Sequence, residues 1–252
     1  MEPTVLVAII TSGAAFTVSI VNFATNRWTV NRSRRTQVLD QVARYRDPLL
    51  YAAFDLRSKL HSIATRHALC DGPDFRGRDR TYQWDYTLFV ICQYLGWAEV
   101  LRRGIQFIDL GKSKSNQKLA ELLFSITSAF ATEYINDTTL WLERGVQRAI
   151  GELMISVPAT SDGPFDCIGY ATFYARRQDD AKFADWLRRV EPGLEGLTSC
   201  AGHQTERLVV LHNRLTDLVE FLDKEAVRFP SKLRERLKVS PPLEARHESQ
   251  AG

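Results

Sequence analysis

Four charged residues have types and spacings that could build a polar binding site. Arg148 and Glu152 lie four positions apart on one expected helix, and Glu99 and Arg102 lie on another. Residues four apart on a helix share a face, so Arg148 and Glu152 form either an ordinary ion pair or part of a pocket wall. We favour the ion pair, and keep a pocket of Glu99, Arg102, Arg148 and Glu152 as the first candidate site.

A second group could bind a metal. His67 and Cys70 are three positions apart, and so are Cys200 and His203. Two thiolates and two imidazoles can close a tetrahedral zinc site, but ordinary zinc motifs pair cysteine with cysteine and histidine with histidine. We therefore favour four unconnected residues over a zinc site, and expect no metal and no cofactor.

The familiar signatures of enzymes are incomplete or missing from the sequence. Residues 110–113 end like a phosphate-binding loop, but Gln106 stands where that loop needs glycine. The only Glu-x-x-His spacing, Glu244 to His247, lies in the polar end of the chain, where it does not suit a metal pair inside a bundle. No nucleophile elbow, zinc-protease helix or dinucleotide-binding turn occurs. We lean toward a protein that is not an enzyme.

The charge balance does not indicate a nucleic-acid partner. The net charge is +3, from 33 basic and 30 acidic residues. Six aromatic residues lie close together without interleaved basic residues, so we interpret them as core rather than as a surface that stacks bases. They are Tyr82, Trp84, Tyr86, Phe89, Tyr94 and Trp97. Cys92 and Cys167 stand in apolar stretches and are expected to be reduced core residues.

Apolar residues that recur every three to four positions predict an all-α fold, with a helical bundle over residues 48–230. Asp47 and Pro48 are typical of a helix start, so we expect a bend or restart there. Helices are predicted over 82–110 and 116–131, from caps at Asn136 and Asp137 through Leu140 to about residue 154, and over 204–223. The last helix has a leucine seam, which we assign to packing within the bundle rather than to a coiled coil. Residues 231–252 are predicted to be a disordered tail.

The first 28 residues have the properties of a membrane anchor. Residues 4–26 carry no charge and are long enough to span the roughly 30 Å hydrocarbon core of a bilayer. A cleaved signal peptide would need an amino-terminal positive charge and a shorter apolar run. A basic cluster follows in the juxtamembrane helix expected over residues 29–47, and it predicts a single-pass protein of the plasma membrane with its amino terminus outside and its bulk in the cytoplasm. The cluster consists of Arg27, Arg32, Arg34 and Arg35.

Small and amide side chains recur along one face of the expected anchor. Such a stripe lets helices approach closely in lipid and form hydrogen bonds between them, so self-association is a hypothesis alongside a chance pattern. The stripe consists of Ser12, Ala15, Ser19, Asn22 and Asn26.

Three strings resemble stretches of uncharacterised helical proteins from actinobacteria. They are YLGWAEVLRR at 94–103, QRAIGELM at 147–154 and CIGYATF at 167–173. The resemblance implies a bacterial protein at the plasma membrane, and it brings no activity or ligand with it.

These patterns lead to three hypotheses for function. The first is a membrane-tethered, non-enzymatic interaction module that binds a protein partner of unknown identity. The second is a membrane-attached enzyme or small-ligand receptor that uses the polar pocket. The third is a membrane-disrupting effector, whose overexpression would be toxic only with residues 1–28 intact.

Overall fold

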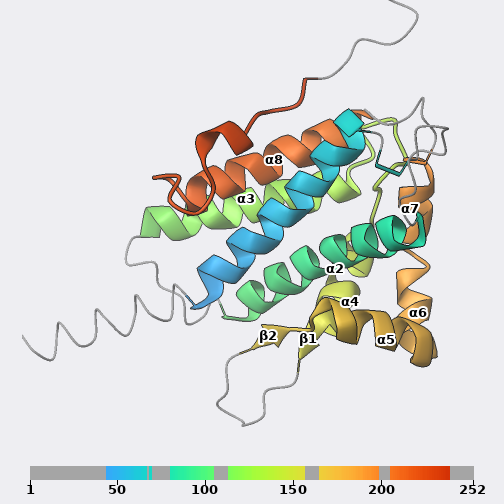
Figure 1. Ribbon diagram of the computed structural model, residues 1–252. Helices are drawn as coiled ribbons and strands as arrows, with labels where there is room; N and C mark the ends of the chain where they lie inside the picture. Colours follow the sequence, from blue (N-terminus) through green and yellow to red (C-terminus); the bar gives the residue numbers. More distant parts are fainter. Residues whose placement is uncertain are drawn as a thin grey trace, which may run out of the picture. The chain divides into compact units, whose positions relative to one another are not determined.

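The computed structural model describes residues 44–66, 68–69, 80–104, 113–156, 165–198 and 205–238, and this part of the chain is mostly helical (Figure 1). All of these residues except Arg44 belong to one compact unit, Tyr45–Gly252. A helical segment over 44–66 comes first. It is followed by α2 (Arg80–Gly104), α3 (Ser113–Ala131), α4 (Arg144–Met154), α5 (Tyr170–Asp179), α6 (Ala181–Leu187), α7 (Glu191–Glu195), α8 (Glu206–Leu222) and the 3-10 helix η1 (Ser231–Leu233). The predicted all-α class is confirmed for this part of the chain.

A single pair of short strands accompanies the described helices. β1 (Ile155–Ser156) and β2 (Asp166–Cys167) run antiparallel, with Ile155 opposite Cys167. They lie in the connection between α4 and α5 and do not form a separate sheet layer.

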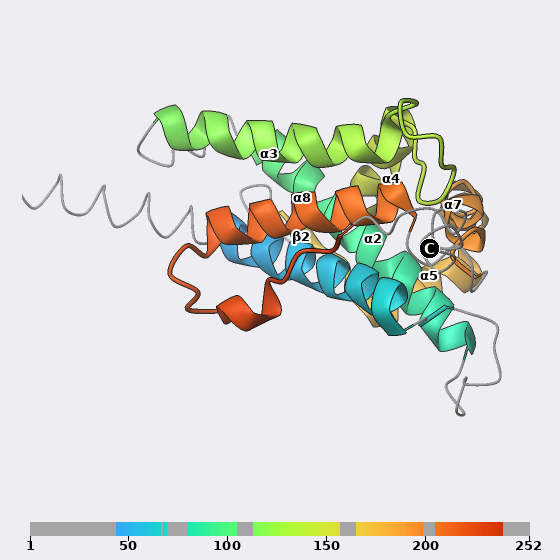
Figure 2. The same ribbon diagram turned by 90° about the horizontal axis from the view of Figure 1, so that it is seen from above.

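Helix α8 lies at the centre of one half of the domain (Figure 2). It packs along α3, and the segment 44–66 lies on its other side. The leucines of the predicted seam are all buried, as bundle packing requires. They are Leu208, Leu211, Leu215, Leu218 and Leu222.

The other half of the domain is built on a close crossing of α2 and α4. A Cβ atom at Gly151 would lie only 2.7 Å from the backbone oxygen of Leu95. One at Gly96 would lie 2.7 Å from Cβ of Met154 on α4 and 2.8 Å from Sγ of Cys167. Both glycines are therefore needed for the helices to approach this closely. Gly96, Gly151 and Cys167 belong to the three strings that carry the actinobacterial resemblance, so these strings meet in one packing contact.

Arg207 fastens the end of α3 to the start of α8. Its side chain is 1% exposed and donates hydrogen bonds to backbone oxygens at the end of α3 and in the following loop, including those of Ala129, Thr132 and Asp137. Asp137 in turn accepts a hydrogen bond from the backbone N–H of Arg207, and Thr205 accepts one from that of Leu208. Backbone groups at the end of α3 and at the start of α8 are thus hydrogen-bonded by the side chains of this region.

Two local predictions are corrected by these contacts. Asp137 does not cap α4, which begins seven residues later at Arg144, because its carboxylate pairs with Thr139 and the start of α8. The expected helix restart at Asp47 and Pro48 is absent, since the described helix runs without interruption over 44–66.

The prediction placed the start of the disordered tail too early in the sequence. Residues 231–238 pack on the domain: η1 is formed, and Arg234 is buried while it donates hydrogen bonds to Asp223 and to the backbone oxygen of Phe229. Asn213 on α8 also bonds both backbone groups of Leu237. Residues 239–252 lie outside the described part of the chain.

No helix in the described part of the chain combines the length and apolar character needed to cross a bilayer. The predicted anchor at 4–26, its self-association stripe and the basic cluster at Arg27, Arg32, Arg34 and Arg35 all lie outside the described residues.

Candidate functional site

Three residues of the predicted polar group meet at the crossing of α2 and α4. Glu99 is 3% exposed, and its carboxylate accepts hydrogen bonds from Nε of Arg102 at 2.7 Å and from Nε of Arg103 at 2.9 Å. Arg103 also reaches Glu152, with 3.2 Å between Nη2 and Oε1. Burial alone raises the pKa of Glu99, but the hydrogen bonds from both arginines more than offset it, so the pKa lies below its ordinary value.

Arg148 does not join this group. Its side chain is exposed on α4, and the bridging role belongs to Arg103, which the sequence pattern did not single out. None of the four predicted residues lines any of the three cavities described below. The group has the geometry of an ion-pair network that connects two helices, and Glu152 pairs in it with Arg103 rather than with Arg148 as expected from the sequence.

The described residues contain no cluster of three or more potential metal ligands. His67, Cys70, Cys200 and His203 lie outside the described part of the chain, so the zinc hypothesis stays a prediction. Burial raises the pKa of the Cys92 thiol far above its ordinary range, and it raises that of Cys167 to about 12. Both thiols are protonated at neutral pH, which makes them poor nucleophiles.

The largest of the three cavities, about 610 Å³, lies between the first turns of α2 and helices α5, α6 and α7. Its charged lining is balanced, with three arginines and three acidic residues. The two smaller cavities measure about 280 and 480 Å³. The larger volume falls in the range of ordinary ligand sites, which is roughly 300 to 1,000 Å³.

A bridge of three charged side chains forms one wall of this cavity. Arg177 on α5 pairs with the buried carboxylate of Asp85 on α2, and its Nη2 lies 2.9 Å from Oε1 of Glu191 on α7. A guanidinium held between two carboxylates is fixed in orientation. The wall is therefore preorganised, and it connects α2 with α5 and α7, which lie much later in the sequence.

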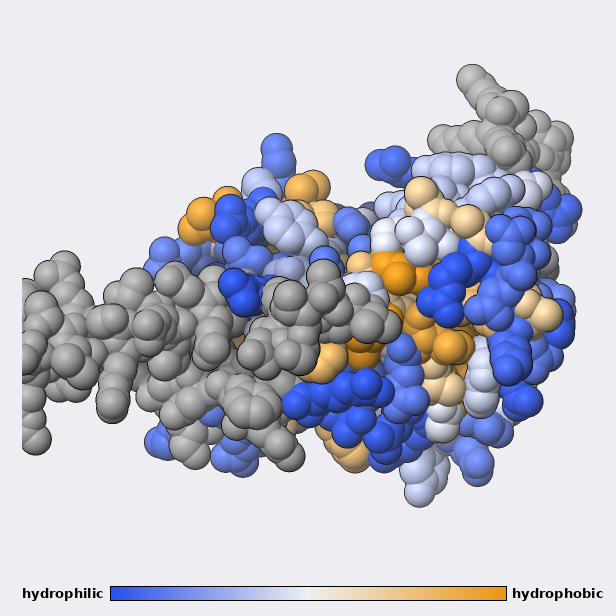
Figure 3. All heavy atoms as spheres, turned by 90° about the horizontal axis from the view of Figure 1, so that it is seen from below, coloured by the Kyte–Doolittle hydropathy of each residue, from blue (hydrophilic) through white to orange (hydrophobic). Residues whose placement is uncertain are grey.

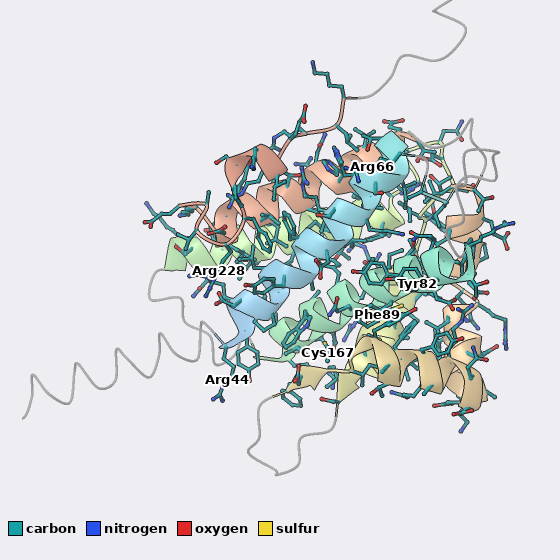
Figure 4. The ribbon with its side chains drawn as sticks, in the orientation of Figure 1. Arg44, Arg66, Tyr82, Phe89, Cys167 and Arg228 are labelled. Atoms are coloured by element: carbon teal, nitrogen blue, oxygen red, sulfur yellow. The ribbon has the colours of Figure 1, made fainter. Side chains whose placement is uncertain are left out.

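Aromatic residues complete the cavity and correct part of the core prediction. Phe89, Tyr94 and Trp97 are buried as predicted, but Tyr82 is 47% exposed and Trp84 is only half-buried, because the start of α2 projects past the packed core. Figure 4 shows Tyr82 and Phe89 on α2. Trp84 lines the cavity together with Tyr174 of α5.

The neighbouring face of the domain is mixed in character. Seen from below, apolar side chains gather between hydrophilic ones toward the middle of the face (Figure 3). Tyr174 is 43% exposed and Phe165 is 38% exposed. Large aromatic side chains are thus available to a partner on α5 and in the segment before it.

The sequence contained little that could have located this cavity. Asp85, Arg177 and Glu191 are ordinary charged residues on three separate helices, and no short motif contains two of them. Trp84 was the only strong signal, because tryptophan among tyrosines is typical of binding surfaces as well as of cores.

Comparison of the chain with family models, curated proteins and solved structures finds no match. The sequence, the fold and the cavity therefore guide the inference of function.

Proposed function

We propose that the chain is a membrane-tethered, non-enzymatic binding module whose cavity between α2, α5, α6 and α7 receives a segment of a protein partner. The observation that supports this most is the composition of the lining. Five of its twelve residues are tryptophan, tyrosine or arginine, the types that contribute most binding energy at protein interfaces.

The electrostatics of the cavity define the kind of segment it would accept. The paired charges of Asp85, Arg177 and Glu191 leave no strong excess of either sign, so a highly acidic or basic peptide is not favoured. Trp84 and Tyr174 offer apolar surface for one large side chain. Arg188 at the rim pairs through Nη2 with the exposed Asp185, and its remaining N–H groups can bind a carboxylate or a backbone oxygen.

The tether in this proposal rests on the sequence of residues 4–26. It predicts that the full chain sediments with membranes after alkaline carbonate washing, and that a chain lacking residues 1–28 is recovered in the soluble fraction. Recovery of both chains in the same fraction would remove the tether from the proposal.

Site-specific photo-crosslinking in the native membrane tests the cavity. A benzoylphenylalanine in place of Tyr174 should cross-link the partner, whereas the same group in place of the exposed Phe124 on α3 should not. Arg188→Glu, at a side chain 62% exposed, should abolish the adduct at position 174 without changing the protein's thermal stability. Adducts that are equal at both positions, or unaffected by Arg188→Glu, would contradict the proposal.

A second candidate function, a small-ligand receptor, is favoured by the volume of the same cavity. Native mass spectrometry of the full chain separates the two. A metabolite bound in one-to-one ratio and lost in Arg188→Glu, with no protein adduct at position 174, would replace the partner with a small ligand.

A further inference from the structure

A second cavity, of about 280 Å³, lies between the segment 44–66 and residues 232–235. Arg57 and His61 are four positions apart, and Ser58, Ser62 and Arg66 follow the same spacing one residue further on. Both rows therefore lie on one side of the helix, and all five residues line the cavity.

The buried Arg57 has hydrogen-bonding capacity left over. Its side chain is 4% exposed; Nε donates to the hydroxyl of Thr216 at 3.2 Å, and Nη2 donates to the backbone oxygen of Glu235 at 2.5 Å. Within the described part of the chain, Nη1 makes no hydrogen bond. The guanidinium is thus held rigidly while one of its nitrogens remains available to a ligand in the cavity.

His61 supplies a second unsatisfied group beside Arg57. Its Nδ1 is buried and has no hydrogen-bond partner among the described residues. The ring lies against that of His212, with 5.5 Å between centroids. Within the described part of the chain, Nε2 of His212 is also buried without a partner. Buried polar atoms without a partner are rare in folded proteins, so two of them beside the cavity mark this region as incompletely satisfied.

The cavity carries an excess of positive charge. Its lining contains Arg57, Arg66 and Lys232 and a single carboxylate, that of Glu235, which gives a net charge of +2 with histidine neutral. Glu220, which does not line the cavity, also acts on Arg57. Arg66 and Lys232 form no ion pair with any residue that the structure describes. Neighbouring Arg236, by contrast, is paired with Asp217 and Glu220.

We infer that this cavity is an oxyanion site that binds a phosphate group, with Arg57 at its base, Arg66 and Lys232 at its rim and the hydroxyls of Ser58 and Ser62 between them. Guanidinium forks, an ammonium group and hydroxyls together match the several acceptor oxygens of a phosphate. The phosphate belongs either to a free phosphorylated compound or to a lipid headgroup, which present the same chemistry. The site shares no lining residue with the cavity between α2 and α7, so it stands independently of the proposed partner.

The test compares the full chain in a neutral detergent with two double variants. Arg66→Gln/Lys232→Gln removes both rim cations, which are exposed, and Arg214→Gln/Lys118→Gln is the matched control at exposed cations outside the cavity. Calorimetric titration with inorganic phosphate, and separately with short-chain phosphatidylglycerol, is done at constant ionic strength. Thermal unfolding of each variant verifies that it is folded.

Wild type and control should bind at least one of the two probes with equal affinity, and the rim variant should bind about tenfold more weakly or not at all. Binding of inorganic phosphate indicates a free phosphorylated compound, and binding of the lipid alone indicates a headgroup. The histidine Cε1–H NMR signal of His61 should shift on binding in the wild type and in the control variant but not in the rim variant. No binding of either probe, or equal binding by the rim variant, would overturn the site.

Discussion

At the scale of single residues, Arg207 shows how a buried cation can serve structure alone. The acceptors of its guanidinium are backbone oxygens between Ala129 and Asp137. Those of Phe130 and Ile135 also accept a backbone N–H, whereas among the described residues those of Ala129, Thr132 and Asp137 accept only from Arg207. Removing the guanidinium leaves the oxygens of Ala129, Thr132 and Asp137 without donors, and each buried unsatisfied group costs about 1 to 3 kcal/mol.

Arg207→Met should therefore lower the free energy of unfolding by about 3 kcal/mol or more. Arg207→Lys should recover part of this loss, because the ammonium can donate to some of the same oxygens but lacks the planar fork. Urea unfolding of the full chain, followed by circular dichroism, gives the measurement. Arg214→Met on the same helix is the control, since that side chain is 52% exposed. A control as unstable as Arg207→Met would remove the proposed role.

Residue patterns in the sequence could predict Glu99 as part of a polar group but not what it does. Arg102 is three positions away and its contact follows helix geometry. Glu152 reaches the group only because two glycines let α2 and α4 cross closely. Whether a charged residue lines a cavity or forms an interhelical ion pair depends on how the helices cross. The spacing of charged residues in the sequence does not determine these crossings.

At the scale of elements, the crossing of α2 and α4 depends on Gly151. An added methyl group there would lie 2.7 Å from a backbone oxygen, which cannot move without shifting α2. Gly151→Ala should reduce the free energy of unfolding by about 1 to 3 kcal/mol, as overpacking in a rigid core does. Thermal or urea unfolding of the full chain provides the measurement.

Gly145 provides a matched control in the same helix. A Cβ atom there meets nothing within 4 Å, so Gly145→Ala should leave stability unchanged or raise it by up to about 1 kcal/mol through helix propensity. Equal effects of the two substitutions would show that helix propensity, and not the close crossing, determines the outcome.

The helical period predicted the elements that bury one clear apolar face. Helices α3 and α8 begin and end within three residues of their expected positions. The period failed between residues 132 and 143, where Asp137 has the local sequence of a helix cap but pairs with a helix start 70 residues later. It also failed for residues 231–238, whose polar sequence is ordered by contacts with Asp223 and Asn213 on or next to α8.

At the scale of the whole molecule, the buried charges make stability depend on pH. Burial lowers the pKa of His212 to about 4, assisted by the cations Arg57 and Arg236 and by His61 when it is protonated, and opposed by a hydrogen bond with Asn213. In the unfolded chain the same imidazole titrates near 6.5. Between these two values the unfolded state binds a proton that the folded state does not, so stability falls as the pH falls.

The expected loss from this one group between pH 7 and pH 4 is about 3 kcal/mol. A second loss should follow at lower pH, because hydrogen bonds and nearby cations outweigh burial and hold the pKa values of Glu99, Asp137 and Asp223 below their ordinary values. For these carboxylates, the stabilisation is present above their unfolded pKa near 4 and disappears as the pH falls through their folded pKa.

Urea unfolding of the full chain at a series of pH values separates the two steps. In His212→Gln the decrease between pH 6.5 and pH 4 should become much shallower, because the imidazole that takes up the proton is gone, while the decrease below pH 4 should persist. Glu99→Gln should do the reverse: it leaves the first step intact and weakens the second. If His212→Gln unfolds with the pH dependence of the wild type, the imidazole is not buried in its neutral form, and the packing of α8 against the segment 44–66 must differ from that described.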